Sequence, residues 1–174
     1  MKLKIKFIFL IVILMGMHIF CKGQQQDTLM NKLPTFNLKD INGKMLNTSE
    51  ITNNGNPVLI CFWKTCCKPP VKMLTAINEV YEDWVDETGV VLYAISVDDA
   101  RNSNLVAPFV NGKGWDYIVL LDPNSDFKRA MNVVFTPHTF LLSGDGEIVW
   151  QKAMYIPGDE EEIYKQIKKT LTNR

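Results

Sequence analysis

An apolar run that ends in a turn with two adjacent cysteines and two adjacent prolines constrains the fold most. Residues 57–61 are apolar and follow the turn-forming stretch 53–56, a combination typical of a buried strand. Beyond Cys66, Cys67 and the prolines, apolar residues recur at helical spacing through residues 71–85. Strand, turn and helix in this order form one half of a βαβ unit, with Cys67 at the helix start. Unpaired N–H groups and the helix dipole there favour a thiolate over a thiol.

This stretch resembles the active-site segment of the TlpA/ResA branch of the thioredoxin superfamily, whose members are extracytoplasmic thiol-disulfide oxidoreductases. Their segment is a hydrophobic strand followed by F-W-x-T-W-C-x-P-C. The chain matches it at Phe62, Trp63, Thr65, Cys67 and Pro69. The resemblance implies an α/β thioredoxin fold, with a central mixed sheet flanked by helices and an N-terminal β-hairpin extension.

Two positions depart from that segment. Cys66 stands where the family has tryptophan before the nucleophile, and Pro70 stands where it has the resolving cysteine. The Cys-x-x-Cys pair is therefore degenerate. Proline has no N–H, so the donor that a second cysteine directs at the first sulfur is lost with the second thiol. A proline is well tolerated in the first turn of a helix, so we expect the fold to be undisturbed.

The rest of the chain follows the family order over roughly residues 34–172. Asn42 and Gly43 predict a hairpin turn between residues 34–38 and residues 44–46. The further predicted elements are a helix start at 48–51, a helix ending at Gly89, a central strand at 90–97, a helix capped by Asp98 and Asp99, a strand at 117–121, a short helix at 125–131, a hairpin of 134–142 with 147–150, and a final helix at 159–171.

The N-terminus has the pattern of a secretory signal peptide over residues 1–23. Three lysines precede an apolar run at residues 7–17, and small residues stand at the −3 and −1 positions for cleavage before Gln24. The run is short for a membrane-spanning helix of ~20 residues, although an uncleaved anchor is the alternative. Bulky Phe20 disfavours a lipoprotein signal that would use Cys21.

We therefore expect three segments: the signal peptide, a polar tether at residues 24–33, and a thioredoxin-like domain at residues 34–174. The mature protein would then work outside the cytoplasm, in a periplasm, where disulfides persist. The chain has 19 basic and 19 acidic residues, which excludes a strongly basic nucleic-acid binder. The expected partners are protein thiols and disulfides, or small thiols, with no nucleic acid and no membrane insertion of the mature domain.

Cys67 is the predicted catalytic nucleophile, and Cys66 is its candidate helper. Either Cys66 is a smaller replacement for tryptophan that opens the site, or it forms a vicinal disulfide with Cys67. Neighbouring Cα atoms lie ~3.8 Å apart, below the usual disulfide range of ~4.4–6.8 Å, so that ring would be strained. Cys61, in the strand, is expected to be a small buried hydrophobic residue. With Cys21 removed, these three cysteines remain of four, which leaves at least one thiol unpaired.

A second group of candidates follows from the resemblance. Pro137 matches the cis-proline of the fold, and Thr136 before it would offer backbone groups to a substrate chain. Trp63 and Pro69 flank the cysteines and are expected to contribute to substrate binding. His138 is either an exposed loop residue beside that substrate surface, a charge partner for Cys67, or a metal ligand with the two cysteines. No recognised ligand spacing is present, so no metal or other cofactor is expected.

The sequence thus supports a leading hypothesis and three alternatives. The leading one is a TlpA-type thiol-disulfide oxidoreductase that works as a monothiol through Cys67. The first alternative is a redox-inactive binding module that uses the groove beside Pro137. A peroxiredoxin-like peroxidase is less favoured, because Thr65 stands two residues before Cys67 instead of three. A metal-binding protein is the last alternative.

Overall fold

A computed structural model of the chain describes residues 31–172. The expected signal peptide at residues 1–23 and most of the expected tether lie outside the described residues. Two residues close to the end of that tether contact the hairpin near the end of the chain. Lys32 bridges to Glu147 in antiparallel fashion, and the Ile148 N–H donates to the Asn31 carbonyl at 2.8 Å. None of the helices described is long and apolar enough to cross a membrane.

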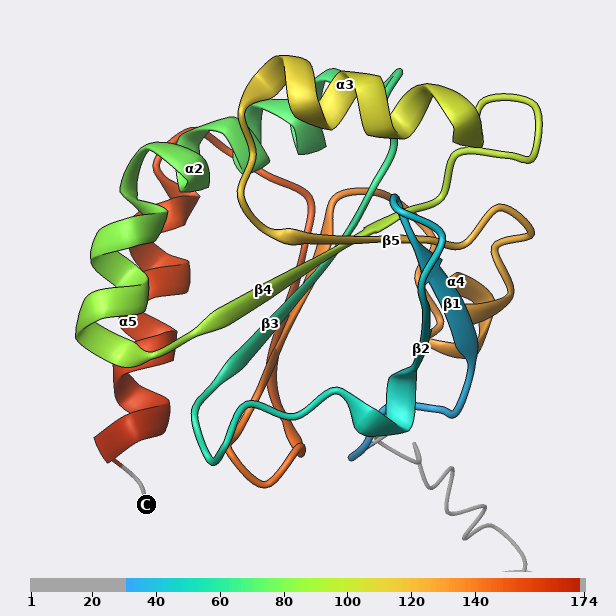
Figure 1. Cartoon of the computed structure of the whole chain (residues 1–174). Coiled ribbons are helices and arrows are strands. Elements are labelled where there is room, and N and C mark those ends of the chain that lie inside the picture. The colour runs from blue at the N-terminus through green and yellow to red at the C-terminus, as the bar shows by residue number, and fades with distance from the viewer. Residues whose placement is uncertain (1–30, 173–174) are drawn as a thin grey trace, which may run out of the picture.

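Seven strands form one mixed sheet in the order β2-β1-β5-β4-β3-β6-β7 (Figure 1). The pairs β3–β4 and β4–β5 are parallel, and all other neighbouring pairs are antiparallel. The strands are β1 (Asn37–Asp40), β2 (Met45–Asn47), β3 (Val58–Trp63), β4 (Val91–Ser96), β5 (Ile118–Leu121), β6 (His138–Leu142) and β7 (Ile148–Ala153). The predicted N-terminal hairpin is confirmed as β1 and β2, with Gly43 at a positive φ of 86° in its turn.

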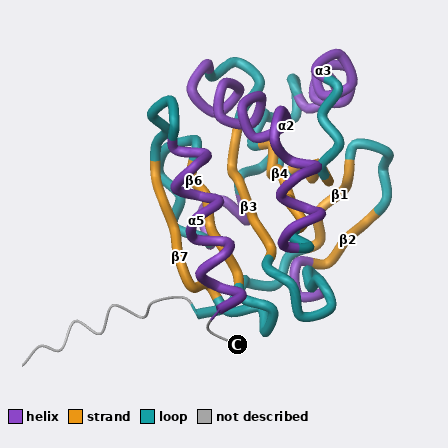
Figure 2. The backbone as a smooth tube through the Cα atoms, turned by 90° about the vertical axis from the view of Figure 1, so that its left-hand side faces the viewer, coloured by secondary structure: helices purple, strands orange, loops and turns teal. Residues whose placement is uncertain are grey.

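Helices pack on both faces of this sheet. They are η1 (Thr48–Glu50), α2 (Lys68–Thr88), η2 (Ser103–Leu105), α3 (Val106–Lys113), α4 (Asp126–Ala130) and α5 (Asp159–Thr172). Helices α2 and α5 lie on the face turned toward the viewer in Figure 2. Side chains from α2, α3 and α5 share one core cluster, and α4 contributes to the other. The α2 helix ends at Gly89, as predicted, with a left-handed φ of 66° and its N–H bonded to the Val85 carbonyl.

The central strands β3 and β4 are buried on both faces, which is why their sequences are nearly continuous apolar runs. Alternate residues of β3 enter the two clusters. Leu59, Cys61 and Trp63 face α2, and Ile60 and Phe62 face α4. The strand extends two residues past its predicted end, so the turn with the cysteines begins only at Lys64.

Candidate thiol site

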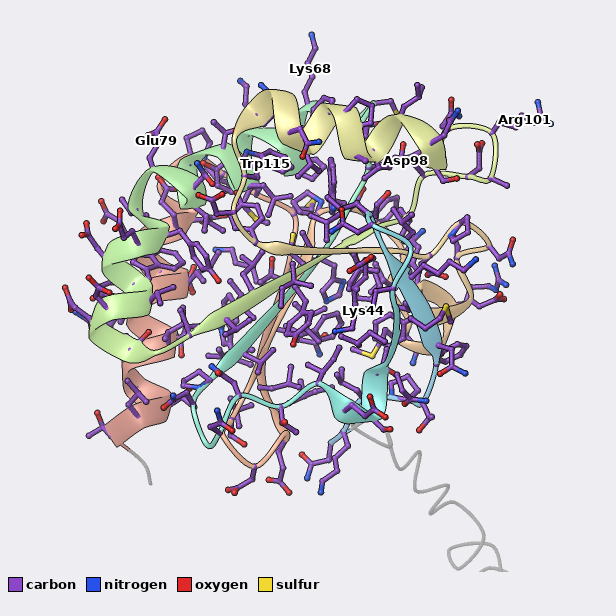
Figure 3. All side chains as sticks on the ribbon, in the orientation of Figure 1. Lys44, Lys68, Glu79, Asp98, Arg101 and Trp115 are labelled. Atoms are coloured by element: carbon purple, nitrogen blue, oxygen red, sulfur yellow. The ribbon has the colours of Figure 1, made fainter. Side chains whose placement is uncertain are left out.

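The turn after β3 places both cysteines at the start of α2. Trp63 is the last residue of β3, and the Cys67 N–H donates to the Lys64 carbonyl at 3.1 Å. Cys67 is the N-cap of α2, in an extended conformation, and its carbonyl accepts from the Val71 N–H at 3.4 Å. The predicted location of Cys67 at the helix start is thus confirmed. Lys68, the first helical residue, projects outward (Figure 3).

The two adjacent thiols are both free and both reachable. Cys66 is exposed and Cys67 is partly buried, and their sulfur atoms lie 3.9 Å apart. That separation is about twice an S–S bond of ~2.05 Å, so the described state is a dithiol. Cys66 is thus open to solvent, whereas Cys67 is only partly accessible.

Two prolines remove the helix donors that an N-cap side chain ordinarily uses. Such a side chain accepts from the N–H of the second or third helical residue. In α2 these residues are Pro69 and Pro70, and Cys67 accordingly makes no side-chain cap hydrogen bond. The thiolate of Cys67 therefore gains less from the helix start than its position alone predicts.

The pKa of Cys67 is shifted in the direction opposite to the one that we expected from the helix start. Burial raises the pKa of the Cys67 thiol above its ordinary value, and the neighbouring Cys66 thiol raises it further. The Thr136 hydroxyl and the positive charge of Lys64 act in the other direction but do not outweigh these effects. The surroundings of Cys67 thus favour the thiol over the thiolate.

The Thr136–Pro137 loop faces the cysteines. The Thr136 side chain lies near enough to the Cys67 thiol to lower its pKa, which brings together two predicted site residues from distant parts of the chain. The Thr136–Pro137 peptide bond is cis, the isomer that the resemblance implied. Pro137 itself is buried, and its carbonyl accepts from the Met154 N–H at 2.8 Å. This bond ties the loop after β7 to the proline loop.

Large apolar side chains are unusually exposed on these two loops. Val134 (70%), Phe135 (69%), Met154 (67%) and Ile156 (69%) are the four most exposed large hydrophobic residues that the structure describes. Val134 and Phe135 directly precede Thr136 in the chain, and the Met154 N–H is bonded to the Pro137 carbonyl. Contiguous exposed apolar surface marks binding sites in soluble proteins. We call these four residues the apolar rim of the thiol site. Pro69, two residues after Cys67, is also exposed.

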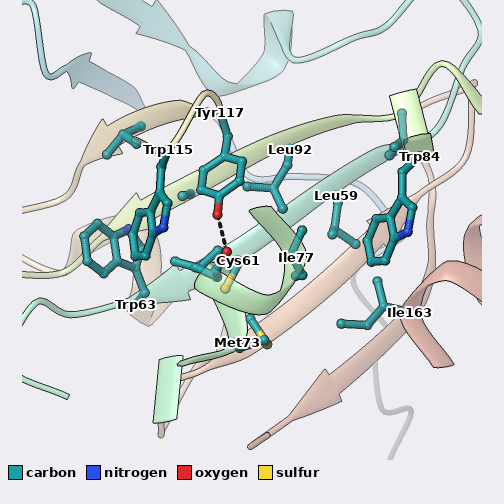
Figure 4. Close-up of a cluster of buried hydrophobic side chains, with 14 of the residues drawn as sticks. Leu59, Cys61, Trp63, Met73, Ile77, Trp84, Leu92, Trp115, Tyr117 and Ile163 are labelled. Atoms are coloured by element: carbon teal, nitrogen blue, oxygen red, sulfur yellow. Dashed lines mark hydrogen bonds between the residues drawn. The ribbon is translucent and has the colours of Figure 1, made fainter. Parts of the chain in front are cut away.

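Trp63 does not take part in this surface, which corrects its prediction as a substrate-binding residue. Its side chain is 0% exposed and packs edge-on against Trp115, with ring centroids 5.1 Å apart (Figure 4). The reason is strand alternation, because Trp63 shares the inner face of β3 with Cys61. Cys61 is likewise 0% exposed, and burial raises the pKa of its thiol to about 12. Cys61 is the small buried residue that we expected.

His138 also differs from its predicted roles as a substrate-binding residue, charge partner or metal ligand. Its ring stacks on Phe140 with centroids 4.5 Å apart, and its Nε2 lies 3.0 Å from the Gln151 side-chain oxygen. The next residue, Thr139, faces α2 and donates to the Met73 sulfur at 3.8 Å, so His138 points to the opposite face of the sheet. Within residues 31–172, no three His, Cys, Asp or Glu side chains are grouped so that they could hold a metal ion.

Asp98 lies beside the cysteine turn, which its sequence position did not lead us to expect. We expected it to cap the following helix, but α3 begins only at Val106, after a 3-10 turn. The buried Asp98 carboxylate instead accepts two hydrogen bonds from Thr65, inside the cysteine turn. The available signal was its position directly after a buried parallel strand, since such strand ends lie beside the active-site turn in open α/β sheets.

Comparisons with known proteins agree with this architecture. Residues 29–151 match the model of the AhpC/TSA family. The chain is 29% identical over 132 residues to the thiol-disulfide oxidoreductase ResA of Bacillus thuringiensis, covering 76% of this chain and 73% of that protein.

Solved structures give the same fold. An uncharacterised thioredoxin-like protein from Porphyromonas gingivalis superposes with a TM-score of 0.73 and 46% identity, covering 80% of this chain and 92% of that one. StoA from Bacillus subtilis superposes with a TM-score of 0.59 and 23% identity, covering 76% and 96% of the two chains. The predicted fold class is therefore confirmed as thioredoxin-like, with helices on both faces of a mixed sheet.

Proposed function

The chain belongs to the AhpC/TSA family of thioredoxin-like proteins, and from that premise we propose a thiol-disulfide oxidoreductase that works through one thiol, Cys67. The observation that carries the proposal is the arrangement around this sulfur. Cys67 caps α2 beside the Thr136 hydroxyl, and the position of a resolving cysteine is filled by Pro70. The similarity to ResA, named for thiol-disulfide oxidoreductase activity, supports the same chemistry.

In the proposed reaction the Cys67 thiolate attacks one sulfur of a substrate disulfide. A mixed disulfide forms with that sulfur, and the other sulfur leaves as a thiolate and takes up a proton. A second thiol, from the same substrate or from a small molecule, then attacks the substrate sulfur and releases Cys67 as a thiolate. Bonds and electrons balance without net oxidation of the protein, so the cycle exchanges or isomerises disulfides.

Cys66 supplies the other route out of the mixed disulfide. Its sulfur, 3.9 Å from that of Cys67, can attack the Cys67 sulfur, form the Cys66–Cys67 disulfide and release the substrate as a thiol. This route oxidises the protein by two electrons and reduces the substrate. The strained vicinal ring is then readily reduced by a second thiol pair.

We propose protein thiols and disulfides as the main substrates, and small thiols as the releasing agents. The apolar rim beside Thr136 supports a polypeptide partner, because glutathione is small and charged and would leave these side chains uncovered. We further propose that the protein acts outside the cytoplasm after cleavage before Gln24, because its N-terminus has the pattern of a secretory signal peptide. The family match begins at residue 29, beyond that cleavage position.

The proposal is tested by exposing the mature protein to glutathione disulfide and mapping adducts by peptide mass spectrometry. We expect the peptide with Cys67 to carry one glutathionyl group in the wild type and in Cys66→Ser. Loss of both free thiols without added mass would identify the vicinal disulfide. If Cys67 takes no adduct in any of these proteins, the monothiol function is wrong and the binding-module alternative replaces it.

A further inference from the structure

Asp98 is a buried carboxylate directed at the cysteine turn. It is 1% exposed and stands two residues after the end of β4 (Figure 3). Its Oδ1 accepts from the Thr65 hydroxyl at 2.6 Å, and its Oδ2 accepts from the Thr65 backbone N–H at 3.0 Å. The Ser96 hydroxyl donates to Oδ2 at 2.9 Å. We call the Thr65–Asp98 pair the turn clamp.

The hydrogen bonds of the turn clamp offset the free-energy cost of burying the Asp98 carboxylate. Among the residues that the structure describes, no Lys, Arg or His forms an ion pair with Asp98. Hydrogen bonds from neutral donors are therefore what compensate the carboxylate, and two of these three bonds come from Thr65. Bonds to a charged group are stronger than neutral ones, so Thr65 is held firmly at two atoms.

The turn clamp lies just beyond the last hydrogen bond between β3 and β4. The β3–β4 ladder ends at Trp63, whose carbonyl accepts from the Val97 N–H at 2.9 Å. Thr65 lies inside the turn that the Lys64–Cys67 bond closes, immediately before Cys66. Past Trp63, the clamp is the link that fastens this turn to the neighbouring strand end.

We infer that Asp98 is a positioning residue for the thiol site: through Thr65 it keeps the cysteine turn closed, so that Cys67 stays partly buried beside Thr136 while Cys66 is exposed. The clamp thereby makes two chemically identical neighbours unequal. The inference concerns the geometry of the free thiols and needs no turnover, so it is independent of the proposed oxidoreductase function.

The test measures the alkylation rates of Cys66 and Cys67 separately with a bulky maleimide, by peptide mass spectrometry. A partly buried Cys67 reacts with such a reagent when the turn opens, whereas exposed Cys66 reacts without opening. Thr65→Val removes one hydrogen bond to a charged group, which raises the open population by roughly tenfold. We expect the Cys67 rate to rise by that factor with the Cys66 rate unchanged. Asp98→Asn shifts it in the same direction, and Thr65→Ser keeps the wild-type rates.

Asp122 provides a matched control. It is an equally buried carboxylate (2% exposed) after the adjacent strand β5, and it accepts from three backbone N–H groups at the start of α4. Asp122→Asn should lower the melting temperature and leave the ratio of the two alkylation rates unchanged. If Thr65→Val and Asp98→Asn fold and retain the wild-type ratio, or if Asp122→Asn changes it equally, the positioning role is wrong.

Discussion

Replacing Pro70 by alanine isolates what the missing backbone donor does to the nucleophile. The third residue of a helix is one of the two whose N–H an N-cap side chain accepts. Pro70 holds that position in α2 and has no N–H, so the change restores a donor aimed at the Cys67 sulfur without adding a second thiol. A donated hydrogen bond favours the thiolate, so the pKa of Cys67 should fall.

The size of the shift follows from the strength of such a bond. A hydrogen bond to a charged group contributes about 1.5–3 kcal/mol, and the lower end applies because Cys67 is only partly buried. One pKa unit corresponds to about 1.36 kcal/mol, so the expected fall is about one unit. Pro70 is itself buried, and loss of its ring methylenes costs about 1–2 kcal/mol of stability, which leaves the protein folded.

The assay is the pH dependence of alkylation at Cys67 in a Cys66→Ser background, which removes the neighbouring thiol. The matched control is Pro108→Ala, because Pro108 is the third residue of α3 and lies in a different helix. The control should leave the pKa of Cys67 unchanged. A Pro70→Ala protein with native helicity and an unshifted pKa would refute the argument that the prolines withhold the helix donors.

Three further predictions concern the rest of the domain. Cys61, fully buried with a pKa of about 12, should resist alkylation in the native protein at neutral pH and react only after denaturation; native labelling would contradict the burial. Burial lowers the pKa of His138, so the folded state binds its proton less readily than the unfolded chain, and the free energy of unfolding should fall as pH drops below 6.5. Urea titrations at several pH values should show this loss reduced in His138→Gln, and an unchanged pH dependence would count against it. Gly144→Ala should destabilise by about 1–3 kcal/mol, because a Cβ there would lie 1.9 Å from the Gly55 carbonyl oxygen. Gly112→Ala, with open space and a helical site, should not destabilise in the same thermal melts; equal melting temperatures for the two would exclude the clash.

Local patterns predicted the frame of the site well. The strand, the cysteine turn and the helix start are consecutive in the chain, so residue order alone brings Cys67 to the N-terminus of α2. The pairing of this turn with Thr136 came from the resemblance, since residues so far apart in sequence carry no local signal. The mixed sheet with flanking helices also came from the resemblance, whereas the order of its strands is known only from the structure.

The errors share a physical origin in side-chain direction. Because β3 is apolar on both faces, its periodicity does not reveal that Trp63 points inward. His138 is the first residue of β6, and its face depends on where the strand starts after Pro137. The role of Asp98 depends on a contact between two parallel strand ends, which becomes visible only once β3 and β4 are paired.

The predicted direction of the pKa shift of Cys67 was wrong for a different reason. The prediction rested on the position of Cys67 at the helix start, whereas burial and a second thiol raise the pKa by more than Thr136 and Lys64 lower it. Such a balance depends on distances and solvent exposure that residue types do not supply. The two prolines were legible in the sequence, but their joint removal of both cap donors follows only from the observed helix start.

Pro70 also determines whether one molecule can carry an electron pair or a covalently bound group from one reaction partner to the next. A dithiol centre stores an electron pair internally and can hand it on after its first partner has left. A single cysteine thiol cannot form an internal disulfide and so cannot store an electron pair by itself. What it keeps between two reactions is a substrate group bound through a mixed disulfide. Only a disulfide between Cys66 and Cys67 would restore this two-electron storage. For that bond to form, the two sulfurs must approach from their present separation of 3.9 Å.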